Sequence, residues 1–181
     1  METGVAARSR HHTGTPAPPQ HSYGLTIVST ANSGGGLPDF GVFHYEQTYT
    51  VYVDVRRTVE DPAPSWTLQY AVLRGAAPQA GAAKSPGASP QGLVPPFPVT
   101  KELPQWPAEL VQKYLHRLIV VYAIIDPEGK FVQMLVKQSP SPQLNEPLLE
   151  ALSKWVFRPG ELDGNPVVVK ALLGIPLSLP D

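Results

Sequence analysis

The sequence predicts an α+β protein. A small antiparallel sheet with two helices, in the order helix, strand, strand, helix, strand, is expected at the C-terminal end, preceded by a β-rich module. Apolar and polar residues alternate over residues 49–55 and again over 66–72, which is the period of half-buried strands. Further along, Leu148, Leu152 and Trp155 follow a helical spacing, next to apolar runs of strand length. The first pattern indicates strands alone, and the second indicates a mixed unit.

The composition indicates folded modules joined by proline-rich connectors. Charged residues make up 16% of the 181 residues, while 22 residues are proline and 15 are glycine. The net charge of -1 provides no electrostatic attraction to nucleic acid or to an anionic membrane, so no nucleic-acid partner is expected. The absence of cysteine excludes disulfides, thiolate chemistry and cysteine-bound metals.

Apolar runs in this chain are short. None approaches the roughly 20 residues that cross a bilayer. The first twenty residues also lack the apolar centre of a signal peptide. If the protein is exported, we expect the targeting or anchoring segment to lie outside this chain.

The chain divides into four parts by composition. The first part has arginines, histidines and prolines but almost nothing to bury, and the third is rich in Ala, Gly, Pro and Ser. The second contains a predicted hairpin between residues 48–56 and 65–73, which needs another strand or sheet to cover its face. The four parts are a disordered tail over 1–20, a β-rich module over 21–74, a linker over 75–102 and a C-terminal domain over 103–181.

The C-terminal domain is the best-defined part. The strand predicted over residues 117–126 is apolar on both faces, which is typical of a central strand covered by a helix. Asp126-Pro-Glu-Gly129 is a tight turn, and Asn145 is a candidate helix N-cap. The expected elements are a helix over 107–115, strands over 117–126 and 130–138, a helix over 145–157 and a last strand over 167–173 and 175–179.

No group of residues predicts catalysis. The five histidines lack the spacing of a metal site, and the glycine-rich residues 32–36 are not followed by the Lys-Ser/Thr of a phosphate-binding loop. Asp126 and Glu128 are explained as turn residues. We therefore expect no enzyme activity, no metal or other cofactor and no small-molecule substrate. A deep pocket lined by His44 or His116 and a carboxylate would support the enzyme hypothesis.

Four motifs of the C-terminal domain occur in a particular order. An aromatic-proline pair, Trp106-Pro107, precedes the first helix, and a hairpin turns at Asp126-Pro-Glu-Gly129. The second helix leads into Trp155-Val-Phe-Arg-Pro159, and Gly164-Asn-Pro-Val167 precedes the last strand. This series resembles the TonB C-terminal domain family over about residues 103–179.

The resemblance implies a periplasmic adaptor. Domains of this family couple the inner-membrane proton gradient to outer-membrane transporters, whose extended N-terminal segment pairs with the edge of the sheet. The expected partners are a TonB-dependent transporter and, through a segment absent from this chain, an inner-membrane proton-channel complex. The expected location is the periplasm, with the full-length protein anchored in the inner membrane through such a segment. The resemblance implies partner contacts at Gln105, Trp106, Pro107, Val167, Val168, Val169, Lys170, Ala171, Leu172 and Leu173.

The sequence also departs from the family pattern. Trp106 stands where tyrosine is common, and Leu103 stands where a contact glutamine occurs. The β-rich module is an addition, and its Val51-Tyr52 echoes Val121-Tyr122, which leaves open a degenerate duplicate. The alternative function is therefore a periplasmic scaffold whose sheet edge is filled by a strand of residues 21–74, without energy transduction.

Overall fold

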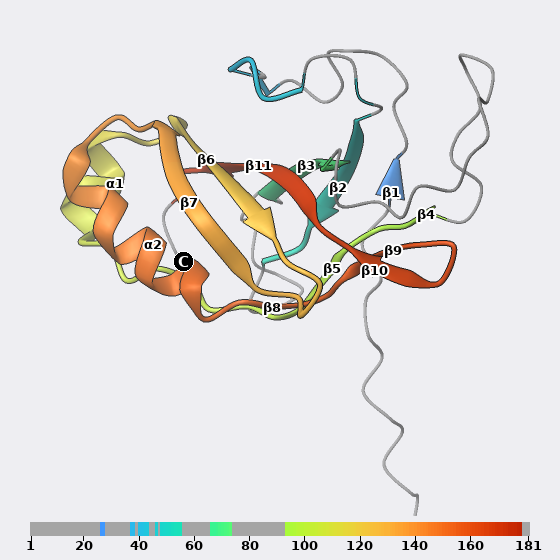
Figure 1. The fold of residues 1–181 in the computed structure, drawn as a ribbon. Coiled ribbons are helices and arrows are strands. Elements are labelled where there is room, and N and C mark those ends of the chain that lie inside the picture. Colours follow the sequence, from blue (N-terminus) through green and yellow to red (C-terminus); the bar gives the residue numbers. More distant parts are fainter. Residues whose placement is uncertain are drawn as a thin grey trace, which may run out of the picture.

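The computed structural model describes residues 26–27, 37–38, 40–43, 46, 48–55, 66–73 and 93–178. It is a mixed α+β structure with mostly antiparallel sheets and two helices, which confirms the predicted class (Figure 1). The predicted tail over 1–20 lies outside the described residues. In chain order the elements are β1 (Thr26–Ile27), β2 (Tyr49–Val53), β3 (Trp66–Val72), β4 (Leu93–Val94), β5 (Phe97–Thr100), α1 (Ala108–Lys113), β6 (Leu118–Ile125), β7 (Phe131–Gln138), a 3-10 turn (Pro142–Leu144), α2 (Asn145–Ser153), β8 (Val156–Arg158), β9 (Gly160–Leu162), β10 (Asn165–Val167) and β11 (Val169–Pro176).

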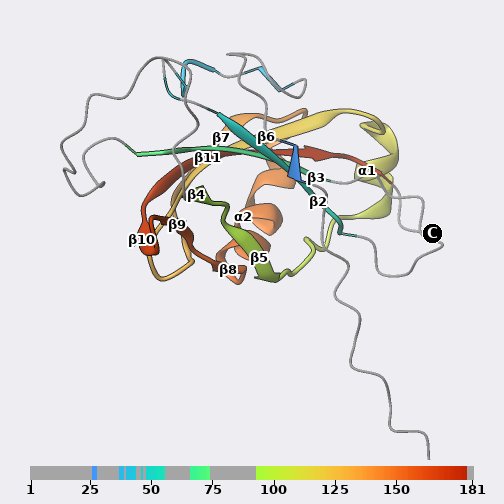
Figure 2. The same cartoon turned by 90° about the vertical axis from the view of Figure 1, so that its right-hand side faces the viewer.

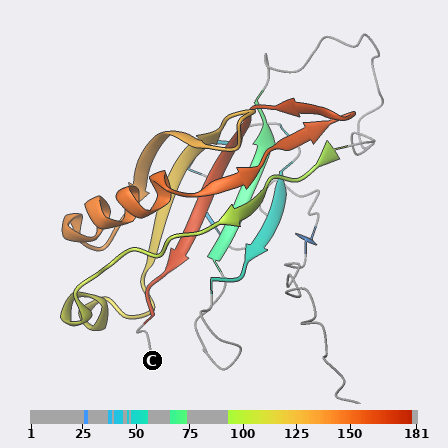
Figure 3. The same cartoon turned by 90° about the horizontal axis from the view of Figure 1, so that it is seen from below.

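The main sheet joins the two halves of the chain. Its strand order is β1-β2-β3-β11-β6-β7, so the last strand lies in the interior of the sheet (Figure 3). β11 is antiparallel to β3, from Val169 opposite Val72 to Gly174 opposite Thr67. On its other side β11 is antiparallel to β6. Strands β2 and β3 therefore belong to the same sheet as the C-terminal strands.

The main core lies on one face of this sheet. The helices and the short strands β4, β5 and β8–β10 cover that face (Figure 2). Helix α2 places Leu148 and Leu152 against the sheet because the two side chains are four residues apart, about one helical turn. Both are fully buried, and burying a leucine contributes about 2 kcal/mol.

The end of the second helix differs from the sequence-based prediction. Helix α2 ends at Ser153, whereas the apolar stripe predicted a helix as far as residue 157. Residues after the helix become β8, which pairs with β5 and keeps Phe157 buried. A short apolar run is compatible with a buried helix and with a buried strand. The apolar stripe alone therefore did not locate the end of the helix.

Two strands, β4 and β5, lie within the segment that the composition predicted as a linker, residues 75–102. β5 pairs with β8 even though it contains Pro98, which is buried opposite Phe157. Residues 75–92 lie outside the described residues. Proline is compatible with an edge strand, because the backbone N–H that it lacks is not needed on the side of the strand that has no neighbour.

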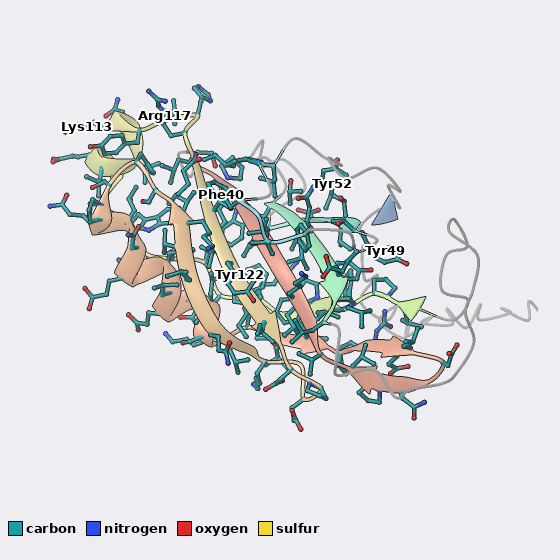
Figure 4. The ribbon with its side chains drawn as sticks, turned by 45° about the horizontal axis from the view of Figure 1, so that its top comes forward. Phe40, Tyr49, Tyr52, Lys113, Arg117 and Tyr122 are labelled. Atoms are coloured by element: carbon teal, nitrogen blue, oxygen red, sulfur yellow. The ribbon has the colours of Figure 1, made fainter. Side chains whose placement is uncertain are left out.

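The other face of the sheet has a second, smaller cluster. Leu37 and Phe43 pack on Val120 of β6 and Leu172 of β11. The partly buried Tyr122 lies beside this cluster on β6 (Figure 4). A segment that precedes β2 in sequence therefore covers part of the outer face of the sheet.

Candidate interaction surface at the last strand

Most of the predicted contact residues on the last strand are buried. Val169, Ala171 and Leu173 belong to the main core. Lys170 and Leu172 point to the opposite face, as the alternation of a strand requires. Each of these five residues is at most 8% exposed, so none is available as a surface side chain.

The edge expected at this strand is occupied. β3 pairs with one side of β11 and β6 with the other, so β11 is an interior strand of the sheet. Val167 belongs to β10, and the carbonyl of Val168 accepts a hydrogen bond from the backbone N–H of Leu73 at 3.0 Å. A partner strand could reach the backbone of β11 at this side only by replacing β3.

The second part of the predicted site lies with the helices. Gln105 and Pro107 are exposed, and Pro107 is the N-cap residue of α1. The indole Nε1 of Trp106 donates a hydrogen bond to the carbonyl of Leu144 at 3.0 Å. This bond attaches the segment to the start of α2, whereas β11 belongs to the sheet. The structure thus divides the predicted site between two layers.

The same segment is held at the other end of α2. The indole Nε1 of Trp155 donates to the carbonyl of Glu102 at 2.8 Å, and the ammonium of Lys154 lies 2.8 Å from the Glu102 carboxylate. Hydrogen bonds to Glu102 first, and to Glu150 next, raise the pKa of Lys154. The two tryptophans of this region therefore use their N–H groups to hold residues 102–106 on α2.

Lys170 makes a buried ion pair that the sequence did not reveal. Its ammonium donates to Glu46 Oε1 at 2.8 Å and to the carbonyl of Val42 at 2.6 Å, and lies 5.8 Å from the centre of the Phe43 ring. The side chains of Lys170 and Glu46 are only 10% and 15% exposed. A single lysine within an apolar strand was the available signal, because a buried charge needs a partner. The sequence offered no way to choose Glu46 from 15 acidic residues.

Two tyrosines stack in the core beside this region. Tyr49 of β2 and Tyr70 of β3 are opposite each other, and their ring centroids are 5.4 Å apart. Burial raises the pKa of Tyr49. Burial first, and then the neighbouring Tyr49, raises the pKa of Tyr70. Both rings pack in the core, and the raised pKa values keep their hydroxyls neutral.

The histidines and carboxylates of the described residues form no metal-binding arrangement. No three His, Asp or Glu side chains among them are placed to hold a metal ion. His116 is exposed, and His44 lies outside the described residues. The carboxylate of Asp126 accepts the backbone N–H of Lys130 at 2.8 Å, which is turn chemistry. Within the part of the chain that is described, no helix has the length and apolar character needed to cross a membrane.

Comparison with known proteins adds no family assignment. No protein-family model matches the sequence, and no curated protein matches it. The TonB resemblance therefore depends on the motifs quoted above and on what those residues do in the structure.

Proposed function

We propose that this chain is a TonB-like periplasmic scaffold that binds other proteins, has no enzyme activity, and fills the edge of its last strand with its own β3. The observation that supports this proposal is the pairing of β11 on both sides, with β3 and with β6. An unpaired strand edge invites aggregation, and proteins commonly cover such edges. In this proposal β3 covers the edge of β11 permanently, and partner proteins bind elsewhere on the molecule.

The TonB-like part of the proposal is supported by the structural roles of its motifs. Gly129 closes the hairpin turn with φ +77°, and its carbonyl accepts the N–H of Phe157 at 2.8 Å. Trp155 and Phe157 are buried against Phe131. Two of the four motifs, the hairpin turn and the element from Trp155 to Pro159, therefore contact each other, as parts of one domain should. We propose that α1, β6, β7, α2 and β11 form the TonB-like arrangement and that β8–β10 are additions to it.

The second candidate is energy transduction. Here the N-terminal segment of an outer-membrane transporter replaces β3 on β11, and a segment outside this chain connects the protein to an inner-membrane proton-channel complex. The antiparallel pairing of β3 with β11 favours this candidate, because backbone hydrogen bonds do not depend on sequence. Each such bond contributes about 1 kcal/mol net, so an exchange of one strand for another can be nearly balanced.

A peptide titration separates the two candidates. The full chain, labelled with nitrogen-15, is titrated with a synthetic peptide that has the N-terminal sequence of a transporter. The scaffold proposal predicts unchanged amide signals for both Trp66–Val72 and Val169–Pro176. Energy transduction predicts that the β11 signals shift while those of β3 lose their hydrogen-exchange protection. The second result would overturn the scaffold proposal.

A reversible lock provides the matched control. Gln69 of β3 is opposite Leu172 of β11, and paired residues of antiparallel strands lie within reach of a disulfide. Because the chain has no cysteine, Gln69→Cys with Leu172→Cys introduces a single possible disulfide. If a peptide binds at β11, oxidation of this variant should abolish the binding and reduction should restore it. Binding that survives oxidation would place the peptide elsewhere.

A further inference from the structure

A short segment lies along the outer face of β11. We define the strap as the described residues 37–38, 40–43 and 46. It contacts β11 at three positions on one face: Leu37 covers Gly174, Phe43 shares a cluster with Leu172, and Glu46 binds Lys170. These positions alternate along the strand and therefore share one face. β11 is thus covered by β3 at its edge and by the strap on its outer face.

The charged contact needs both of its members. The Lys170 ammonium is almost excluded from solvent, and it is bound by the Glu46 carboxylate and the Val42 carbonyl. Removing one partner of a buried ion pair leaves the other charge buried without compensation, which is strongly unfavourable. When the strap lies away from the sheet, both groups can be hydrated. Loss of the carboxylate therefore destabilises the closed state, in which the strap lies on the sheet, but not the state in which the strap lies away from it.

The contact at the other end depends on size. A Cβ atom placed on Gly174 would lie 2.4 Å from Cδ2 of Leu37 and 3.0 Å from its Cδ1. The missing side chain at Gly174 is therefore what allows Leu37 to pack on the strand. Leu37 is 8% exposed, so it depends on this position for its burial. Gly174 also lies opposite Thr67 of β3, which brings the strap contact and the β3 pairing to the same place.

The strap leads directly into the hairpin that fills the edge. The hydroxyl of Thr48 lies 3.5 Å from the carbonyl of Glu46, and β2 begins at Tyr49. β2 pairs with β3, from Tyr49 opposite Tyr70 to Val53 opposite Trp66. The strap, β2 and β3 are therefore consecutive parts of one unit that covers β11. Figure 4 shows Phe40 of the strap, together with Tyr52 of β2 and Tyr122 of β6.

We propose that the strap is an autoinhibitory latch, in which the Lys170–Glu46 ion pair and the Leu37–Gly174 contact hold β3 on β11 and regulate access to that strand. This inference rests on the second candidate, energy transduction, because only there does a partner strand bind at β11. The latch itself is a property of the free protein, so it can be measured without any partner.

Hydrogen exchange of the full chain tests the charged contact. Glu46→Gln should increase the exchange rates of the Trp66–Val72 amides about a hundred-fold relative to the β6–β7 amides, because the closed state retains an uncompensated ammonium. The matched control is Glu150→Gln, which removes one member of the exposed pair with Lys154 and should change neither set of rates. An equal increase in all strands, or no increase in β3, would overturn the proposal.

A double variant tests whether charge itself is responsible. In Glu46→Met with Lys170→Met, the buried pair is replaced by two apolar side chains, which is often neutral or stabilising. The β3 amides should then return to within a few-fold of their original rates. If the β3 amides exchange as fast as in Glu46→Gln, the ion pair does not hold β3 on β11 and the proposal fails.

A size-complementary pair tests the second contact. Gly174→Ala should displace Leu37 and raise the exchange of β3, and Leu37→Ala in the same chain should remove the collision and reverse part of that increase. Gly164→Ala is the control for a general loss of stability, because its Cβ meets nothing within 4 Å and its cost comes from the positive φ of +80°. It should not raise the exchange of β3 more than that of β6. If Gly174→Ala changes β3 and β6 equally, the effect is general and the latch is contradicted.

Peptide binding distinguishes the latch from the function on which it rests. If Glu46→Gln loosens β3 and a transporter peptide then shifts the β11 amides, both the latch and the energy-transduction candidate are supported. If β3 loosens but the peptide still causes no shift, the latch is supported and energy transduction is contradicted. If the peptide binds equally to the original chain and to Glu46→Gln, the strap does not regulate access and the proposal is overturned.

Discussion

The indole rings of Trp66 and Trp155 stack with their centroids 5.4 Å apart and an interplanar angle of 10°. Trp66 is the first residue of β3, and Trp155 follows α2 in the C-terminal part of the chain. Both are buried, and such aromatic pairs contribute about 1 kcal/mol beyond their buried area. The stack therefore connects the N-terminal hairpin to the core of the domain that follows.

Trp66→Ala should destabilise the whole structure. Loss of the ring leaves a cavity on Trp155, and such truncations cost about 3 to 5 kcal/mol. Urea unfolding should still show one transition, moved to lower denaturant, because β3 and β11 share a sheet. Trp106→Phe is the control, since it mainly removes a hydrogen bond to Leu144 worth about 1 kcal/mol. An early separate transition in Trp66→Ala would mean that the hairpin unfolds independently.

Gly129→Ala should be far more harmful than Gly164→Ala. Both glycines have positive φ, 77° and 80°, so each alanine has a left-handed backbone that costs about 1 to 2 kcal/mol. At Gly129 the added Cβ would also lie 1.9 Å from the carbonyl oxygen of Phe157, whereas at Gly164 it meets nothing within 4 Å. Chemical unfolding of the two variants measures the difference. Equal losses would show that the turn does not depend on its approach to β8.

Tyr49→Phe should stabilise the protein. The Tyr49 hydroxyl is buried without a hydrogen-bond partner among the described residues. An unsatisfied buried hydroxyl costs about 1 to 3 kcal/mol, so its removal should recover about 1 kcal/mol in unfolding experiments. Thr50→Val is a second case, because its hydroxyl is also unpaired among those residues. A loss of stability in Tyr49→Phe would indicate that a water molecule satisfies this hydroxyl.

Stability should decrease in alkaline solution. Burial raises the pKa of both Tyr49 and Tyr70 in the folded state above the value of about 10 expected in the unfolded chain. The unfolded state therefore loses protons first, and folding stability is complete below pH of about 10 and decreases above it. Each affected tyrosine removes up to about 1.4 kcal/mol per pH unit in that range. Thermal unfolding between neutral and alkaline pH measures the slope.

The variant Tyr49→Phe with Tyr70→Phe is the control for the pH experiment. It retains both rings but removes the two ionisable hydroxyls. Its melting temperature should therefore decrease less steeply above pH of about 10 than that of the original chain. Identical slopes would assign the alkaline loss to other groups.

Local patterns predicted much of the fold. The period of two residues located β2 and β3 to within a few residues, and the Asp126-Pro-Glu-Gly129 turn is present between β6 and β7. Strand pairing was harder, because alternation specifies which face is buried and not which strand is the neighbour. The end of α2 was also missed, since Trp155 and Val156 continue the helical spacing of Leu152 beyond the last helical residue, Ser153.

One available signal for the candidate site was not used. Residues 167–173 are apolar on both faces, which is the pattern that correctly marked residues 117–126 as a central strand. The same reasoning predicts that β11 is interior, as the structure shows. The alternative function named a strand of residues 21–74 as the second neighbour, but its identity as β3 and its register remained beyond sequence reasoning. So did the Glu46 partner of Lys170, because both depend on contacts between distant parts of the chain.

The position of β11 determines when the sheet can form. β3 and β6 are both synthesised before β11, and both need that strand as a neighbour. Pairing of distant segments is slow, since the loops between them must close before any contact is gained. During synthesis the chain therefore has two apolar strand pairs, β2–β3 and β6–β7, each with an unpaired edge. These edges must not pair with each other before β11 is made. A chain that stops before Val169 would contain two separate hairpins and no shared sheet.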